Sequence, residues 1–295
     1  MHAGALAVLQ QAGGFATTAQ LLMVMTRQQL DVQVRNGGLK RVWYGVYAAE
    51  EPGLSGRLTA LDIFMGQHAV VCMSTAAALY GFDTENATAI HILDPGVRVR
   101  PTVGLMVHQR TGAPLQRIAG RLATRPAWTA VEVARQLRRP RAIATLDAAL
   151  RSTRCSRVEL ERTVAKQRGR RGIVAVRNLL PFADGRAESA MESEARLVMI
   201  DHEIPVPELQ YPIHGRDGEL WRVDFAWPGA RLAAEYESIE WHAGRAEMLR
   251  DKMRWGKIQE LGWTIIPIVV DDVRRQPGHL ANRIASHLDR PRMAS

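Results

Sequence analysis

The chain has 295 residues, 46% of them hydrophobic, which is enough to bury the core of one large domain or of two to three small ones. Its formal net charge of +9 favours a polyanionic partner. Cys72 and Cys155 are too few for a disulfide framework or a zinc-ligand cluster, and no stretch has the roughly 20 apolar residues of a membrane span. We therefore expect a cytoplasmic protein with no membrane segment.

The first fifty residues predict three short helices followed by a β-hairpin. A first helix ends at a glycine pair, and Thr17 or Thr18 can cap a second helix, AQLLMVM, that buries one apolar face. Thr26 can cap a third helix, RQQLDVQVRN, and LKRVWYGVYA indicates two strands turning near Tyr44 and Gly45. This is the order of a winged helix-turn-helix, whose third helix enters the DNA major groove.

The predicted third helix and hairpin carry polar side chains that can reach phosphates or base edges. They are Arg27, Gln28, Gln33, Arg35 and Asn36 on the helix, and Lys40 and Arg41 on the wing. The alternative is a winged helix used only for packing or dimerisation, because the net charge of residues 1–50 is a modest +2.

Residues 53–184 predict a mixed α/β region that becomes helical and basic. AIHILD and GLMVHQR indicate strands in which His91 and His108 are half-buried rather than metal ligands, and WTAVEVARQL, AIATLDAALR and VELERTVAKQ indicate helices. The RGRRG run after the last helix is a candidate phosphate-contacting turn through Arg168, Arg170 and Arg171, although loop arginines also serve solubility.

The basic charge is concentrated in this middle region. Residues 110–180 carry seventeen basic and four acidic residues, a net charge of +13, whereas residues 181–295 carry a net charge of −4. We interpret the basic segment as a surface for nucleic acid. A merely solvated helical face is the alternative, because only four of the 39 basic residues are lysine and such an arginine bias is common in GC-rich genomes.

From residue 185 the pattern indicates helix, strand, two hairpin strands, helix, strand and helix. Ser189 lies three residues before Glu192, a spacing typical of a helix start, so Glu192 is a candidate for either helix capping or metal binding. PVPELQYPIHG has the prolines of an edge strand. WRVDFAW and RLAAEYE then form the predicted hairpin, separated by Pro228 and Gly229.

Three carboxylates gather on this predicted hairpin. Asp224 lies on its first run, and Glu235 and Glu237 share one face of the second, because residues two apart on a strand point the same way. Converging carboxylates repel unless a cation lies among them, and Mg²⁺ or Mn²⁺ suits an all-oxygen site. The alternative is that these side chains form salt bridges with neighbouring arginines such as Arg254.

Five motifs, in order, carry a resemblance to a known family. They are Ser189-x-x-Glu192, Val223–Pro228, Glu235–His242 with its Trp-His end, Arg250-Asp251-x-x-Arg254, and Leu261–Trp263. Over roughly residues 187–275 the chain resembles a bacterial family of endonuclease-like domains, similar to the very-short-patch-repair (Vsr) endonucleases of the PD-(D/E)xK fold. The N-terminal half resembles the AbiEi-type antitoxin winged helix that often precedes such a domain, with residues 55–180 as a connecting region.

The expected fold is therefore α/β, or α+β overall, in three parts. Residues 1–52 are expected to form the winged helix-turn-helix, and residues 53–184 a mixed α/β to helical connecting domain. Residues 185–295 are expected to form a PD-(D/E)xK restriction-endonuclease-like sheet flanked by helices.

The resemblance implies metal-dependent hydrolysis of double-stranded DNA. Asp224, Glu235 and Glu192 correspond to the ligands of Mg²⁺ or Mn²⁺, His242 or Glu237 to the proton carrier, and Arg254 to a group that stabilises the pentavalent phosphate. The lysine of the nuclease motif is absent, and Glu237 stands where related sequences usually carry aspartate. Endonuclease activity is thus a hypothesis.

The same residues fit a second function, a non-catalytic DNA-binding regulator or antitoxin that keeps a degenerate nuclease fold. A cognate toxin would then be a further partner. A cation between Asp224 and Glu235 favours the nuclease, whereas an arginine filling that space favours the regulator.

Overall fold

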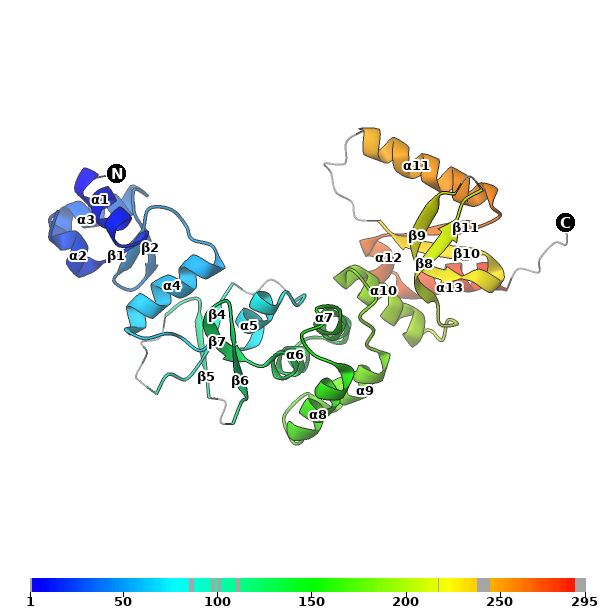
Figure 1. Ribbon diagram of the computed structural model, residues 1–295, viewed down its shortest axis with the longest axis horizontal. Helices are drawn as coiled ribbons and strands as arrows, with labels where there is room; N and C mark the ends of the chain where they lie inside the picture. The colour runs from blue at the N-terminus through cyan, green and yellow to red at the C-terminus, as the bar shows by residue number, and fades with distance from the viewer. Residues whose placement is uncertain are drawn as a thin grey trace. The chain divides into compact units, whose positions relative to one another are not determined.

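The computed structural model describes residues 2–84, 88–96, 99, 102–109, 112–216, 218–237 and 245–289. The chain divides into an N-terminal unit, Met1–Leu79 with Asn86–Arg125, and a C-terminal unit, Tyr80–Glu85 with Pro126–Ser295. Both units combine helices with small sheets, so the predicted mixed α/β class is confirmed (Figure 1). The predicted domain limits after residues 52 and 184 fall inside these units and stay a prediction.

The N-terminal unit begins with helices and strands that the sequence largely predicts. They are α1 (Ala3–Gln11), β1 (Phe15–Thr17), α2 (Thr18–Leu22), α3 (Arg27–Arg35), β2 (Lys40–Trp43) and β3 (Val46–Ala48). Thr17 and Thr26 cap α2 and α3, each in a reciprocal capping box with the glutamine three residues later. However, α2 ends at Leu22, so the helix is shorter than the predicted AQLLMVM, and Met23 just after it is 84% exposed.

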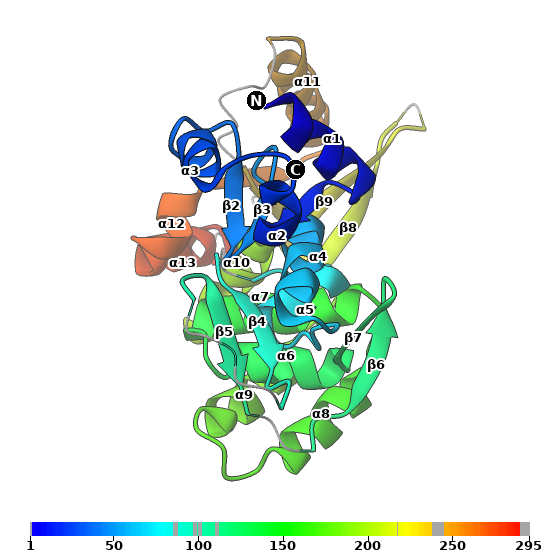
Figure 2. The ribbon, with the colours of Figure 1, turned by 90° about the vertical axis from the view of Figure 1, so that its left-hand side faces the viewer.

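The first three helices pack against a small antiparallel sheet (Figure 1, Figure 2). The strand order is β1-β3-β2, and the predicted hairpin turns at Tyr44 and Gly45, where Gly45 has a φ of +73° that favours glycine. The core beneath consists of Ala5, Leu9, Ala16, Leu21, Met25, Leu30, Leu39 and Tyr47. Burial of Leu30 fixes which face of α3 points outward.

The rest of the N-terminal unit carries two strand pairs. The elements are α4 (Leu54–Met65), α5 (Met73–Tyr80), β4 (Ile90–Leu93), β5 (Leu105–His108), β6 (Leu115–Ile118) and β7 (Arg121–Thr124). Strands β4 and β5 pair in parallel, and β6 and β7 form an antiparallel hairpin. His91 and His108 are half-buried and stacked, with Nδ1 of the first 2.8 Å from Nε2 of the second, so the predicted half-buried strand histidines are confirmed.

The C-terminal unit opens with helices joined by buried ion pairs. Its first elements are α6 (Pro126–Ala134), α7 (Arg139–Arg151), α8 (Arg157–Lys166), α9 (Ile173–Leu179), the 3₁₀ turn η1 (Leu180–Phe182) and α10 (Ala190–Asp201). Arg141 of α7 donates to Glu194 of α10 at 3.0 Å, and Arg196 of α10 donates to Asp147 of α7 at 2.6 Å. These pairs hold α7 against α10, because breaking either one leaves a buried charge without a partner.

A four-stranded sheet forms the end of the C-terminal unit. The remaining elements are β8 (Glu208–His214), β9 (Leu220–Trp227), the turn η2 (Pro228–Ala230), β10 (Leu232–Tyr236), α11 (Arg245–Glu260), β11 (Thr264–Ile268), α12 (Val270–Arg274) and α13 (Pro277–Leu288). The strand order is β11-β10-β9-β8, with β10 and β11 parallel and the other pairs antiparallel, so the predicted edge position of β8 is confirmed. One face packs on α10, α12 and α13, and the other on α11 (Figure 1).

Two further features bear on the expected cellular setting. None of the helices in the described ranges combines the length and the hydropathy that crossing a membrane requires. Cys72 and Cys155 are both buried, and burial raises the pKa of the Cys155 thiol to about 12, which keeps that thiol protonated and unreactive.

Candidate functional site

Asp224 and Glu235 lie opposite each other on the β9–β10 hairpin. The antiparallel register places Trp227 opposite Leu232 and Phe225 opposite Ala234, so the next pair outward is Asp224 and Glu235. Residues opposite each other in an antiparallel pair project from the same face of the sheet. The predicted hairpin is therefore confirmed, and it brings these two carboxylates together.

The carboxylate of Glu235 already has three strong donors from α11. Arg254 donates through Nη1 to Oε1 at 2.9 Å and through Nη2 to Oε2 at 2.7 Å, and the indole Nε1 of Trp255 donates to Oε2 at 2.7 Å. Glu235 is only 6% exposed, and burial raises the pKa of its carboxyl even though Arg254 acts in the opposite direction. An arginine thus occupies the position beside Glu235.

Glu192 and Asp224 are joined by one amide group. The Nε2 of Gln210 donates to Oε2 of Glu192 at 2.9 Å and to Oδ1 of Asp224 at 3.4 Å. The backbone N–H of Glu188 also donates to Glu192 at 2.7 Å, and that of Tyr236 donates to Asp224 at 2.8 Å. Ser189 caps α10 by accepting from the backbone N–H of Glu192, as predicted, so Glu192 begins the helix and also belongs to the acidic cluster.

Burial raises the pKa of both Glu192 and Asp224. The negative charge of Asp224 raises the pKa of Glu192 further, and that of Glu188 does the same for Asp224. In the acidic cluster of Glu192, Asp224 and Glu235, the half-buried Asp224 therefore repels both buried glutamates.

The donors around these carboxylates decide whether a metal fits. A divalent cation of the Mg²⁺ type needs carboxylate oxygens that are free to face it. Both oxygens of Glu235 face Arg254 or Trp255, and Gln210 lies between Glu192 and Asp224. Among the described residues there is no group of three histidine, cysteine or acidic side chains placed to hold a metal ion. The cluster as arranged does not fit the Mg²⁺ or Mn²⁺ that the resemblance implies.

The other predicted catalytic residues do not take the places that the resemblance implies, as far as the structure describes them. Glu237 lies just after β10 and is exposed, whereas Glu235 two residues earlier is buried. Arg254, expected to contact phosphate, is instead the bidentate partner of Glu235. His242 lies outside the described residues.

The predicted DNA-contacting helix presents a polar outer face. Leu30 of α3 is buried, while Arg27, Gln28, Arg35 and Asn36 are exposed and Gln33 is partly exposed. The pattern follows from 3.6 residues per turn, which places Gln28 and Arg35 on the side of α3 opposite Leu30. On the hairpin, Arg41 is exposed and Lys40 is half-buried.

The RGRRG turn separates its three arginines. Arg168 and Arg171 are exposed, but Arg170 donates to the buried Glu132 at 2.8 Å and lies 4.9 Å from the centroid of the Trp128 ring. Arg170 is thus engaged in holding the turn to α6. Only the other two arginines present their charge to solvent.

Several site residues escape sequence reasoning. Gln210 and Trp255 donate to the acidic cluster, but because their side chains are neutral, no charge pattern in the sequence indicates them. Val32 and Tyr44 are 38% and 62% exposed beside the predicted DNA-contacting residues, and their only signal is an apolar or aromatic side chain at an outward position.

Comparison with known protein families gives a match over one region of the chain. A family model of the AbiEi antitoxin C-terminal domain matches residues 69–182, from just before α5 to the end of η1. The AbiEi-like part of the predicted resemblance is confirmed, but the match falls on the region expected to be a connecting segment rather than on residues 1–52.

Two proteins of Mycobacterium tuberculosis align with nearly the whole chain. The uncharacterized proteins MT2308 of strain CDC 1551 and Rv2248 of strain H37Rv are each 82% identical over 270 residues, which is 92% of this chain and all of the relative. The chain belongs to the same family as these two mycobacterial proteins.

Proposed function

We propose that the protein is a DNA-binding regulator of a toxin–antitoxin type system, in which residues 1–52 form a winged helix that contacts duplex DNA. The observation that supports this most is the outer face of α3, where exposed arginine, glutamine and asparagine side chains lie opposite the buried Leu30. Such side chains make the usual hydrogen bonds to phosphates and to purine edges in the major groove. The β2–β3 hairpin, with its exposed Arg41, follows in the order that a wing requires.

The AbiEi antitoxin C-terminal domain supports the same role. The C-terminal unit would then serve as a packing and partner-binding body rather than as a nuclease. Its Arg254–Glu235 pair agrees with a degenerate site, because an arginine lies where a nuclease would place a cation. The cognate toxin is the partner that this family implies.

The test is the salt dependence of binding to the DNA upstream of the protein's own gene. Each phosphate contact adds about 0.9 to the slope of log affinity against log salt concentration. We expect the triple variant Arg27→Ala, Arg35→Ala, Arg41→Ala to lose most of this binding and to have a smaller slope. A slope near zero for the unaltered protein would overturn the proposal.

A matched control uses exposed arginines of the C-terminal unit. The triple variant Arg186→Ala, Arg216→Ala, Arg222→Ala removes the same charge from side chains remote from α3 in the sequence. We expect this control to keep the affinity and the slope of the unaltered protein. An equal loss in both triple variants would mean that net charge, and not the α3 face, governs binding.

A metal-dependent endonuclease is the second candidate function. One observation favours it: the half-buried Asp224 lies near the buried Glu192 and Glu235, and burial raises the pKa of all three carboxyls. This function requires Arg254 to move away from Glu235. Nicking of supercoiled plasmid DNA in the presence of Mn²⁺, with loss of nicking in Asp224→Asn, would support it, whereas unchanged nicking in that variant would assign the activity to a contaminant.

A further inference from the structure

A groove between α8 and α9 shares no residue with either candidate site. It has a volume of about 460 Å³, within the range of pockets that bind a ligand or an anchoring side chain, and it lies in the region matched by the antitoxin domain. Its buried floor is formed by Val164, Ile173 and Leu180, and Val174 at the rim is 54% exposed. The floor is therefore apolar, and the rim offers further apolar surface to a partner.

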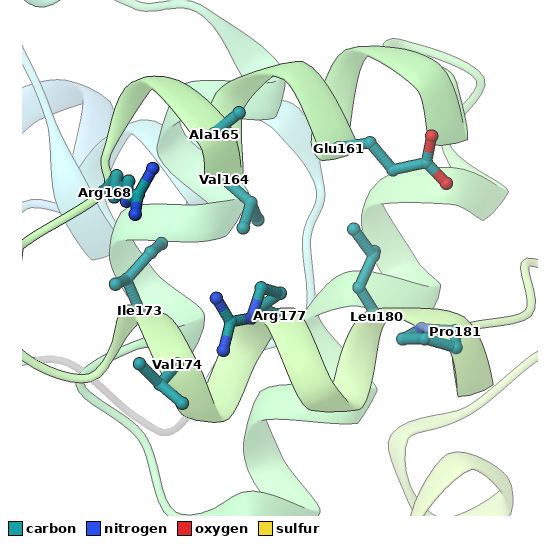
Figure 3. A pocket seen from close by; sticks show the side chains of 9 residues that line it. All are labelled: Glu161, Val164, Ala165, Arg168, Ile173, Val174, Arg177, Leu180 and Pro181. Carbon is teal, nitrogen blue, oxygen red and sulfur yellow. The ribbon is translucent and has the colours of Figure 1, made fainter.

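Two arginines border this apolar floor. Arg168 follows α8 and Arg177 lies on α9, and in Figure 3 both guanidinium groups lie toward the Ile173 end of the groove. Both are exposed, and within the described part of the chain neither guanidinium has an ion-pair or hydrogen-bond partner. Glu161 lines the opposite end of the groove, with its carboxylate directed away from the arginines (Figure 3).

We propose that this groove binds an acidic segment of a protein partner. An apolar side chain of the segment fills the floor, and a neighbouring aspartate or glutamate binds Arg168 and Arg177. Arginine suits this role because its planar guanidinium pairs with a carboxylate through two parallel hydrogen bonds. The net charge of +13 over residues 110–180 adds a long-range attraction for an acidic partner.

The apolar floor distinguishes this occupant from nucleic acid. Phosphate contacts need only exposed cations and backbone N–H groups, so a DNA surface gains little from Val164, Ile173 and Leu180. Protein interfaces, in contrast, take most of their affinity from an apolar anchor in a pocket with charged groups at its rim. Partner binding in this groove does not depend on DNA binding by α3, so separate experiments test the two.

The experiment displays random peptides of about 16 residues, long enough for four helical turns, and selects binders to the full-length protein. We expect the selected peptides to combine Leu, Ile or Phe with Asp or Glu. Arg168→Glu, Arg177→Glu should weaken their binding roughly tenfold or more, which is about 1.4 kcal/mol. Arg162→Glu on α8, which does not line the groove, is the matched charge reversal and should keep the affinity.

A neutral variant separates the two kinds of partner. Val174→Ser removes part of the apolar rim without changing the charge, so it should weaken peptide binding and leave the affinity for duplex DNA unchanged.

Three outcomes of the selection would each overturn the proposal: peptides without acidic residues, peptides bound equally well by the double variant, or the absence of any selected peptide. Displacement of the peptides by duplex DNA with equal loss of both affinities in Val174→Ser would assign the groove to nucleic acid instead. A dimer that Arg168→Glu, Arg177→Glu converts to monomer would assign it to a second copy of the chain.

Discussion

The guanidinium of Arg254 pairs with the carboxylate of Glu235 through two hydrogen bonds of 2.9 and 2.7 Å on the buried face beneath α11. The family resemblance assigns Glu235 to a metal ion and Arg254 to a phosphate, yet the structure joins them to each other. A substitution at either position therefore alters stability as well as any activity, and stability must be measured first.

We expect Arg254→Gln to lower the free energy of unfolding by about 3 kcal/mol, because the partly exposed Arg254 is the charged partner of the buried Glu235, and its removal leaves that buried charge uncompensated. Urea denaturation with an unchanged m value measures this loss. Arg222→Gln is the matched control: Arg222 pairs with Glu188 at 2.6 Å, but its side chain is 56% and that of Glu188 50% exposed. An exposed pair is worth less than about 1 kcal/mol, so equal losses in the two variants would contradict the expectation.

Glu192 gives the acidic cluster a defined pH dependence. Burial, with the nearby charge of Asp224, raises the pKa of Glu192 above its ordinary value of 4.5. A raised pKa means that the stability contributed by the protonated carboxyl is fully present below the unfolded pKa and is lost as pH rises through the folded pKa. We expect Glu192→Gln, which is neutral throughout, to have a higher Tm than the unaltered protein at about pH 8, and the difference to shrink toward about pH 4.

Scanning calorimetry across this pH range checks the prediction. Glu237→Gln is the control, because Glu237 lies nearby in the sequence but is exposed. A Tm difference for Glu192→Gln that stays constant with pH would show that helix capping, rather than repulsion within the cluster, governs this position.

The sequence predicts the local elements well because their signals are local. Thr26 and Ser189 begin helices as expected, since an N-cap hydroxyl acts on an N–H three residues away. The β9–β10 hairpin follows from two apolar runs around Pro228 and Gly229. The three-residue strand β1 escapes prediction because it is too short to show a periodicity, and it exists through its pairing with β3.

The candidate site is predicted only in part, because partners depend on tertiary placement. Spacing brings Asp224 close to Glu235, but nothing in the sequence states that α11 places Arg254 and Trp255 on that carboxylate. In the same way, the sequence does not distinguish the three arginines of the RGRRG run, although Arg170 forms an ion pair with Glu132, a residue 38 positions earlier in the chain. A run of like charges in the sequence does not indicate which side chains form ion pairs in the folded protein.

Val32 lies at the centre of the outer face of α3, about 200° around the helix from the buried Leu30 at 3.6 residues per turn. It is 38% exposed between Gln28 and Arg35, and an apolar group at such a position suits the methyl group of thymine. We expect Val32→Ala to relax sequence preference at one base pair by about 1 kcal/mol while leaving the salt slope unchanged. Arg35→Ala should instead weaken binding to all sequences and reduce the slope by about 1. Binding measured across a panel of single-base variants of the upstream DNA distinguishes the two, and a reduced slope in Val32→Ala would contradict the assignment.

Arg170 and Arg171 are adjacent in the basic turn, but Arg170 has a buried partner whereas Arg171 is exposed, so replacing each in turn separates stability from surface charge. Arg170→Ala should lower stability by about 1–3 kcal/mol, because it removes a hydrogen-bonded partner of the buried Glu132 and a cation–π contact with Trp128. Arg171→Ala removes the same charge from an exposed side chain, so we expect its stability to stay within about 0.5 kcal/mol of the unaltered protein. If the turn contacts phosphate, Arg171→Ala also lowers DNA affinity at low salt. Stability losses in the reverse order would show that the Glu132 pair does not hold the turn.

The last prediction concerns the cation that the resemblance implies. A ligand that binds only the folded state raises Tm in proportion to the logarithm of its concentration above the dissociation constant. Because Arg254, Trp255 and Gln210 already donate to the carboxylates, we expect millimolar Mn²⁺ to leave the Tm of the unaltered protein unchanged. In Arg254→Gln the Oε1 of Glu235 loses Arg254 as its donor while Trp255 still donates to Oε2, and Mn²⁺ bound between that Oε1 and Asp224 should then recover part of the lost stability. The double variant Arg254→Gln, Asp224→Asn is the control and should show no recovery. A Tm increase in the unaltered protein that disappears in Asp224→Asn would instead restore the metal-dependent nuclease as the leading function.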